Sequence, residues 1–192
     1  MTDPIISGYQ KKIVSVIENI DSDSVSKLCF ELKKVWKNGN QVFICGNGGS
    51  AANAMHFTND LIYGISKDCG KGIKAHALPA NQSIVTCYAN DLSYEEIFSK
   101  QLDVLGNPGD VLIVLSGSGN SDNIIRAIVR AKEIGMKTYG LLGYSGGRAL
   151  GLLDCAIHIK VDDMEVSEDC QLVILHMVKM WLINNMNAGE NQ

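Results

Sequence analysis

The sequence predicts an α/β fold, a three-layer αβα sandwich in which helices cover both faces of a central, mainly parallel sheet. Two observations lead to this fold class. Segments with strand character alternate with segments with helix character along the 192 residues, and the expected strands are apolar throughout. Such strands are buried on both faces, which is typical of parallel sheets. Ligands of these sheets bind beyond the carboxyl ends of the strands.

Two amphipathic helices are expected before the first strand, over 5–20 and 23–38. Each carries an apolar stripe at helical spacing. The stripe of the first consists of Ile13, Val16, Ile17 and Ile20. The stripe of the second consists of Leu28, Leu32 and Val35. Asp21 or Ser22 is the expected N-cap of the second helix, which Asn38-Gly39-Asn40 ends.

Strands and helices then alternate. The runs expected to form strands are 41–46, 73–78, 84–88, 111–115, 138–142 and 155–159. The further helices expected are 50–63, 93–104, 121–134 and 167–187. Gly135 is the expected C-cap of the third of these helices, because glycine adopts the left-handed conformation without strain.

Size and composition predict one domain, residues 1–192, with no linker or low-complexity tract. No apolar run approaches the ~20 residues that span a bilayer, and the N-terminus lacks the pattern of a signal peptide. A cytoplasmic protein without membrane contact is therefore expected. The net charge of −4 argues against a nucleic-acid partner, which would need a basic patch. The six cysteines form no C-x-x-C pair, which predicts reduced, mostly buried thiols.

Two glycine-serine loops carry the strongest functional signal. They are Gly46-Asn47-Gly48-Gly49-Ser50 and Ser116-Gly117-Ser118-Gly119-Asn120-Ser121, and each lies between an expected strand and an expected helix. Backbone N–H groups at such a turn bind anions, helped by the helix dipole. Neither loop has the spacing of a nucleotide-binding motif. Each could be a tight turn without a ligand, but the pair favours a phosphorylated small molecule.

Two pairs of side chains could carry chemistry. His56 and Asp60 are four residues apart, which places them on one helix face about 40° apart. Glu168 and His176 are eight apart on the last helix, within roughly 80° of each other. Taken alone, His56, Asp60 and His176 are each more often structural, and their joint occurrence with both loops is what favours a function. The other histidines, His76 and His158, lie in expected strands and are interpreted as structural.

Together these residues resemble the sugar isomerase (SIS) domain family, and within it the phosphoheptose isomerases. Besides the two loops, the matching stretches are Ala54-Met55-His56-Phe57, Ala89-Asn90-Asp91, Gly143-Tyr144-Ser145-Gly146-Gly147 and the last helix with His176. The resemblance implies a flavodoxin-like sheet of five strands. It also implies conversion of sedoheptulose 7-phosphate to D-glycero-D-manno-heptose 7-phosphate, for surface polysaccharide. Homotetramers with sites at subunit interfaces are implied too, with residues 1–38 contributing to their packing.

The resemblance also implies roles for individual residues. Zn²⁺ would be held by His56, Asp60, Glu168 and His176. Proton transfer would fall to Asp60 or Glu168 together with His176. The substrate would be bound by Asn47, Gly48, Gly49, Ser50, Asn90, Asp91, Ser116, Gly117, Ser118, Ser121, Glu165 and Glu168. The chain departs from the family pattern at Asp60, where glutamate is usual, at Glu168, where glutamine is usual, and at Gly117, where threonine is common.

Two alternatives stay open. A non-catalytic relative could bind sugar phosphates or a replication initiator protein as an adaptor. An isomerase could act on a different sugar phosphate, which the three departures make relevant. The retention of two histidines and two carboxylates favours an enzyme, because proton transfer next to a carbonyl needs such groups.

Overall fold

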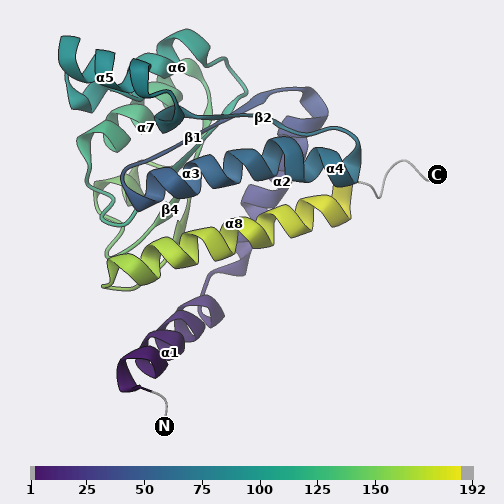
Figure 1. Cartoon of the computed structure of the whole chain (residues 1–192). Helices are drawn as coiled ribbons and strands as arrows, with labels where there is room; N and C mark the ends of the chain where they lie inside the picture. Colours follow the sequence, from purple (N-terminus) through teal and green to yellow (C-terminus); the bar gives the residue numbers. More distant parts are fainter. Residues whose placement is uncertain (1–2, 187–192) are drawn as a thin grey trace.

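A computed structural model describes residues 3–186 and confirms the three-layer α/β fold (Figure 1). Its sheet has five strands in the order β2-β1-β3-β4-β5, and every neighbouring pair is parallel. The strands are β1 (Gln41–Gly46), β2 (Lys74–Ala77), β3 (Val111–Ser116), β4 (Lys137–Leu142) and β5 (Cys155–His158). Five of the six predicted strands are thus present, near their expected positions.

Alternate residues of the central strands enter two separate cores. Val42 and Ile44 pack in one core, whereas Phe43 and Cys45 pack in the other, as the period of a strand requires. The first core is covered by α2 (Ser22–Asn38), α3 (Gly49–Asn59) and α8 (Met164–Met186). The second is covered by α5 (Gln82–Asp91), α6 (Ser99–Leu105) and α7 (Asp122–Ile134). Burial on both faces explains why the strands are apolar throughout.

The predicted strand over 84–88 is wrong, because these residues form part of α5. Asn81 caps this helix, its side chain accepting a hydrogen bond from the N–H of Ile84 at 3.2 Å. Asn90 and Asp91 are its last residues. The helix expected over 93–104 is divided into a 3-10 turn, Tyr94–Glu96, and α6.

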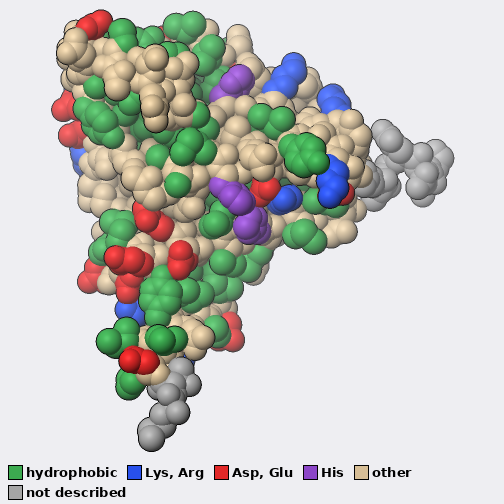
Figure 2. Space-filling model, in the orientation of Figure 1, with side chains coloured by type: hydrophobic (Ala, Val, Ile, Leu, Met, Phe, Trp, Pro, Cys, Tyr) green, Lys and Arg blue, Asp and Glu red, His purple; other side chains and the backbone are tan. Residues whose placement is uncertain are grey.

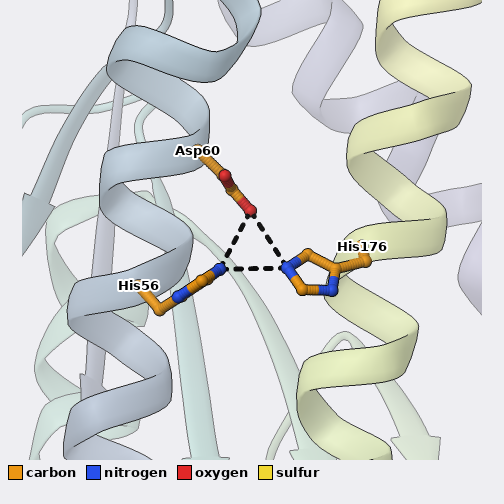
Figure 3. A group of neighbouring side chains, drawn as sticks. All are labelled: His56, Asp60 and His176. Atoms are coloured by element: carbon orange, nitrogen blue, oxygen red, sulfur yellow. Dashed lines mark hydrogen bonds and ion pairs between the residues drawn. The ribbon is translucent and has the colours of Figure 1, made fainter.

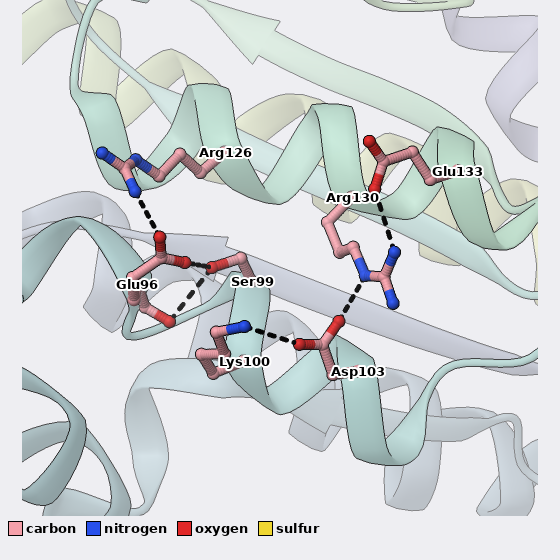
Figure 4. A network of polar contacts seen from close by, with 7 residues as sticks. All are labelled: Glu96, Ser99, Lys100, Asp103, Arg126, Arg130 and Glu133. Atoms are coloured by element: carbon pink, nitrogen blue, oxygen red, sulfur yellow. Dashed lines mark hydrogen bonds and ion pairs between the residues drawn. The ribbon is translucent and has the colours of Figure 1, made fainter. Parts of the chain in front are cut away.

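A charged network joins α6 and the preceding turn to α7 (Figure 4). Its members are Glu96, Ser99, Lys100, Asp103, Arg126, Arg130 and Glu133. Arg126 pairs with Glu96, and Arg130 bridges Asp103 and Glu133. Hydrogen bonds from Ser99 and Arg126 lower the pKa of Glu96. The network therefore links α6 and the preceding turn to α7 on the solvent-exposed side of this helical layer.

The helix expected over 50–63 is interrupted. It runs as α3 to Asn59, continues as a π-helical turn over Asp60–Gly64, and ends as α4 (Ile65–Cys69). In the π-helical turn the N–H of Ile65 donates to the carbonyl of Asp60, five residues earlier. Such turns often mark functional sites, and this one begins at a predicted site residue.

The N-terminal helix α1 (Pro4–Glu18) projects away from the sheet and lies against α8 (Figure 1). Tyr9 donates a hydrogen bond to Asp169 at 2.6 Å, and Lys12 pairs with Asp163 at 2.6 Å. The bond to Asp169 helps raise the pKa of Tyr9 to about 12. All residues of α1 are at least partly exposed.

The remaining expectations concern helix ends, thiols and membrane spans. Gly39 ends α2 and Gly135 ends α7, both in the left-handed conformation. The thiols of Cys29, Cys45 and Cys170 are buried, and burial raises their pKa, to about 11 for Cys29 and Cys170. Within residues 3–186, no helix combines the length and apolar character that crossing a membrane requires.

Candidate functional site

The two glycine-serine loops lie side by side, because β1 and β3 are neighbours in the sheet although β2 separates them in sequence. A cavity of about 270 Å³ opens between them, here called the loop pocket. Its lining consists of Asn47, Gly48, Ser50, Leu115, Ser116, Gly117, Ser118, Ser121, Met164 and Glu168. The structure thus brings most of the predicted substrate-binding residues together at the carboxyl edge of the sheet.

The first loop already holds an anion from within the chain, the Glu168 carboxylate. Glu168 Oε1 accepts hydrogen bonds from the N–H of Ser50 at 3.0 Å and from its hydroxyl at 3.4 Å. Gly49 is required for this approach, because a Cβ there would lie 2.1 Å from Glu168 Oε2. The carboxylate therefore occupies the amino end of α3, where the helix dipole favours negative charge.

The second loop offers hydroxyl and backbone donors. Ser121 is the N-cap residue of α7, and its side chain makes no capping hydrogen bond there. The hydroxyls of Ser116 and Ser118 accept hydrogen bonds from the N–H groups of Gly119 and Asn120, at 3.0 and 3.2 Å. Each hydroxyl can therefore still donate its own proton to a ligand oxygen.

Three predicted metal ligands converge between α3 and α8 (Figure 3). His56 Nε2 lies 3.0 Å from His176 Nε2, and Asp60 Oδ2 lies 3.5 and 3.4 Å from these two nitrogens. We call these residues the His–Asp–His group. Ligand atoms around a tetrahedral Zn²⁺, with bonds of about 2.0–2.2 Å, lie about 3.3–3.5 Å apart. The triangle therefore has nearly the dimensions of one face of such a site.

The environment of Asp60 supports the same fit. Its side chain is 5% exposed and its Oδ1 accepts a hydrogen bond from Lys179 at 2.6 Å. Asp60 Oδ2 is buried and has no hydrogen-bond partner among the described residues. Buried carboxylate oxygens normally have a partner, so an oxygen left open toward two imidazoles suits a cation. The donors of the His–Asp–His group thus fit Zn²⁺.

The His–Asp–His group faces the outside of the chain. The side chains of His56 and His176 are 47% and 45% exposed. Figure 2 shows histidine side chains exposed on this face of the molecule, with apolar, acidic and basic side chains beside them. A substrate or a second protein chain can therefore reach both imidazoles without any change of the fold.

Glu168, the expected fourth ligand, lies apart from this group. Eight residues separate it from His176 on α8, a rise of about 12 Å along the axis. Its carboxylate is bound to Ser50 instead. Within residues 3–186 the converging metal-ligating side chains are therefore three, not the four expected.

Four predicted substrate-binding residues lie outside the lining of the loop pocket. One is Gly49, which lies in the first loop against the Glu168 carboxylate. The other three are exposed. Asn90 and Asp91 are exposed at the end of α5, where Asn90 donates a hydrogen bond to Asp91 at 2.9 Å. Glu165 is exposed in the first turn of α8. Their expected roles would need a substrate that extends beyond the pocket or a second chain.

Sequence reasoning missed residues that support the site. Asn123 and Tyr94 both donate hydrogen bonds to Asn47 Oδ1, at 2.8 and 3.0 Å, and so fix the first loop. No local pattern marks them, because the contacts join distant parts of the chain. Lys179, by contrast, follows His176 by three residues, a spacing that places both on one helix face.

Comparisons with known proteins agree with these features. Residues 8–143 match the SIS domain family. A phosphoheptose isomerase from Helicobacter pylori strain P12 is 39% identical over 168 residues, covering 88% of this chain and 85% of that protein. A phosphoheptose isomerase from Aliarcobacter butzleri strain RM4018 is 35% identical, with 94% of each chain covered. The solved structure of a phosphoheptose isomerase from Francisella tularensis has a TM-score of 0.88 at 25% identity, covering 94% of this chain and 95% of that one.

Proposed function

Because the chain belongs to the phosphoheptose isomerases of the SIS-domain family, we propose that it converts sedoheptulose 7-phosphate to D-glycero-D-manno-heptose 7-phosphate. The observation that carries this proposal is the placement of two sites along the same helices. The loop pocket lies at the start of α3 and near the start of α8, and the His–Asp–His group lies further along both. A sugar phosphate held by its phosphate at the loop pocket would extend along these helices toward the His–Asp–His group.

The phosphate is assigned to the second loop. The N–H of Ser50 is already bound to Glu168, and its hydroxyl lies between Glu168 and Gln171, at 3.4 and 3.1 Å from their Oε1 atoms, so the first loop has fewer donors to offer. Ser116, Ser118 and Ser121 line the pocket with hydroxyls that can donate to phosphate oxygens. Binding at this end places the far carbons of the sugar toward the His–Asp–His group and fixes their register.

The isomerisation moves one proton between neighbouring carbons. A base removes the proton from C1 of the ketose, the electron pair of that bond forms the C1=C2 double bond of an enediol, and the C2 oxygen is protonated. Reprotonation at C2 and loss of the O1 proton then give the aldose. Asp60 Oδ2 is assigned the proton from C1, since it is buried without a hydrogen bond among the described residues. Asp60 is assigned the return of this proton to C2 as well, and His176, whose Nε2 lies 3.4 Å from Asp60 Oδ2, is assigned to hold the group that would polarise the substrate oxygens.

His56, Asp60 and His176 are the residues that would hold Zn²⁺, and the bound ion would polarise the carbonyl and hydroxyl oxygens during the reaction. Glu168 is assigned to the phosphate end of the substrate and not to the metal, since its carboxylate lies at the first loop. This assignment separates the role of Glu168 from that of Asp60, which the sequence left open.

The experiment is turnover of sedoheptulose 7-phosphate by the full chain, with and without added Zn²⁺, scored for aldose product. Alanine at Asp60 should reduce kcat by at least about 100-fold, the usual contribution of a group that transfers a proton, and alanine at His176 should reduce it through loss of the polarising group. Binding of the sugar phosphate should largely survive, because its phosphate is held elsewhere. Unchanged turnover in both variants would remove the basis of the assignment.

A homotetramer with sites shared between subunits is part of the proposal. Ile5, Ile6 and Val14 on α1 are exposed, as are Met177 and Met180 on α8 beside His176. Exposed apolar side chains that gather near a site are typical of an interaction surface. The cytoplasmic location and the role in surface polysaccharide synthesis stay predictions.

An isomerase for a different sugar phosphate is the second candidate, favoured by the carboxylate of Glu168 in the loop pocket. Comparing turnover of sedoheptulose 7-phosphate with turnover of five- and six-carbon ketose phosphates under identical conditions separates the two candidates. A higher kcat/KM for a shorter sugar would favour the second candidate.

A further inference from the structure

Lys179 is the cation next to the His–Asp–His group. It lies on α8 three residues after His176, and its Nζ donates to Asp60 Oδ1 at 2.6 Å. Its side chain is 25% exposed, whereas that of Asp60 is 5% exposed. Lys179 therefore reaches from the surface of α8 into the buried side of the group.

This contact distinguishes the two oxygens of one carboxylate. Oδ1 is held by the ammonium group of Lys179, and Oδ2 is left 3.5 and 3.4 Å from the imidazole nitrogens of His56 and His176. A charge-assisted hydrogen bond of this length restrains rotation of the carboxylate. Without it, the short side chain of Asp60 would have no partner among the described residues to fix which oxygen faces the histidines.

The backbone around Asp60 is arranged to admit the lysine. A Cβ at Gly64 would lie 2.8 Å from Lys179 Cε and 3.0 Å from its Nζ, so the absence of a side chain there makes room for the ammonium group. The N–H of Ile73 donates to the carbonyl of Leu61 at 2.9 Å, which ties the π-helical turn to the start of β2. Asp60 and Gly64, the first and last residues of this turn, thus both lie next to the ammonium group of Lys179.

We propose that Lys179 is a positioning residue, which binds Asp60 Oδ1 so that Oδ2 is presented to the metal position and to the substrate. Partners of metal ligands commonly act in this way, and losing them weakens metal binding by about 10- to 100-fold. The opposing effect is repulsion between the ammonium group and a cation. We expect the positioning effect to be larger than this repulsion, because Asp60 is buried. Without Lys179, the unpaired Oδ1 would favour conformations in which the carboxylate turns away from the histidines.

The first measurement is the affinity of the full chain for Zn²⁺ alone, by competition with a chromogenic chelator. Lys179→Met keeps the aliphatic chain and removes the charge, and should weaken Zn²⁺ binding at least about 10-fold. Lys37→Met, on the exposed end of α2, removes the same charge and should leave the affinity unchanged. Tighter binding in Lys179→Met would overturn the proposal, because repulsion would then be the main effect of the lysine.

Gly64→Ala tests the same contact without altering the lysine. Gly64 has helical dihedral angles, and its new Cβ would collide with the flexible end of Lys179, while Asp60 Oδ1 lies at an ordinary contact distance of 3.4 Å, so the fold should tolerate the change. The displaced ammonium group should then release Asp60, and Zn²⁺ affinity should fall as in Lys179→Met. An affinity equal to that of the unaltered chain in both variants would refute the positioning role.

Turnover supplies the second readout, which rests on the proposed function. Lys179→Met should lower kcat for sedoheptulose 7-phosphate while KM changes little, because the phosphate is held at the second loop. If the unaltered chain binds Zn²⁺ through this contact but does not turn over the sugar, the proposed function fails and the role of Lys179 stands. If the chain is active and Lys179→Met retains both Zn²⁺ affinity and kcat, the role of Lys179 fails and the function stands.

Discussion

At Gly117, a side chain would collide with Met164. A Cβ at that position would lie 2.4 Å from Met164 Sδ, which lines the loop pocket from the start of α8. The threonine that is common there in the resembling family would therefore need a different residue or rotamer at position 164. The glycine at position 117 is thus coupled to Met164, which is distant in sequence. The thioether of Met164 occupies the space that the threonine side chain would need.

Glu168 gives a prediction at the scale of one residue. Glu168→Gln keeps an acceptor for the N–H of Ser50 but removes a negative charge from the wall of the loop pocket. Inorganic phosphate should then bind several-fold more tightly, because like charges repel at short range. The amino end of α3 should lose about 0.3–1 kcal/mol of stabilisation.

Calorimetry of phosphate binding, together with thermal unfolding, measures both effects. Glu165→Gln is the matched control, since Glu165 lies one turn earlier on α8, is exposed and does not line the pocket. Equal phosphate affinity in Glu168→Gln and the unaltered chain would show that the phosphate binds away from Glu168.

At the scale of the element, α5 shows where local pattern is insufficient. Ile84-Val85-Thr86-Cys87 is a β-branched apolar run that matches the pattern of a strand. In the structure Val85, Tyr88 and Ala89 contact the second core, at the spacing of one helix face. Asn81 supplies the cap that starts the helix. The strand propensity of this run was visible in the sequence. That β2 is the edge strand, and that this run does not pair with it, is a tertiary feature that the sequence did not show.

The cap of α5 can be tested directly. Asn81→Ala removes the acceptor for the N–H of Ile84 and should lower the free energy of unfolding by about 1 kcal/mol. The melting temperature should fall by about 2–4 °C for a chain of this size. Asn81→Asp retains an acceptor and should be close to the unaltered protein. A melting temperature unaffected by the alanine would mean that the cap contributes little to stability.

The candidate site was predictable where its residues are close in sequence. The spacing of His56 and Asp60 indicated one helix face, and the structure places both in the His–Asp–His group. Glu168 and His176 were expected together because their angles around α8 are similar, but angle alone ignores the rise between them. Which residue Glu168 contacts depends on where α3 begins relative to α8, a tertiary relation that no spacing within one helix contains.

At the scale of the whole molecule, α1 packs on the fold with partly buried side chains only, and none of its residues is buried. Tyr9 bonds to α8, and Lys12 pairs with a carboxylate just before α8. Ile13 and Val16 pack against the first core. Ile5 is 83% exposed at its outer end. A helix with apolar side chains on its free surface gains stability when a second chain covers them. The shape of the single chain is therefore consistent with the proposed assembly.

Assembly can be tested by sedimentation. Ile5→Asp combined with Ile6→Asp should convert the expected tetramer to a smaller species, because each charge would have to be buried without a partner. Lys11→Asp, at an exposed position of the same helix, is the control and should leave the sedimentation coefficient unchanged. A monomeric unaltered chain would contradict the proposed sharing of sites between subunits.

The π-helical turn at Asp60–Gly64 changes which side chains face outward and which face the core along the continuous helical segment from α3 to α4. A turn with one extra residue rotates everything after it by about 100° relative to a continuous α-helix. The part before the turn directs His56 toward the outer face, whereas the part after it directs Ile65 fully into the first core. The extra residue therefore lets the same helical segment present an imidazole to the outside before the turn and an apolar side chain to the core after it.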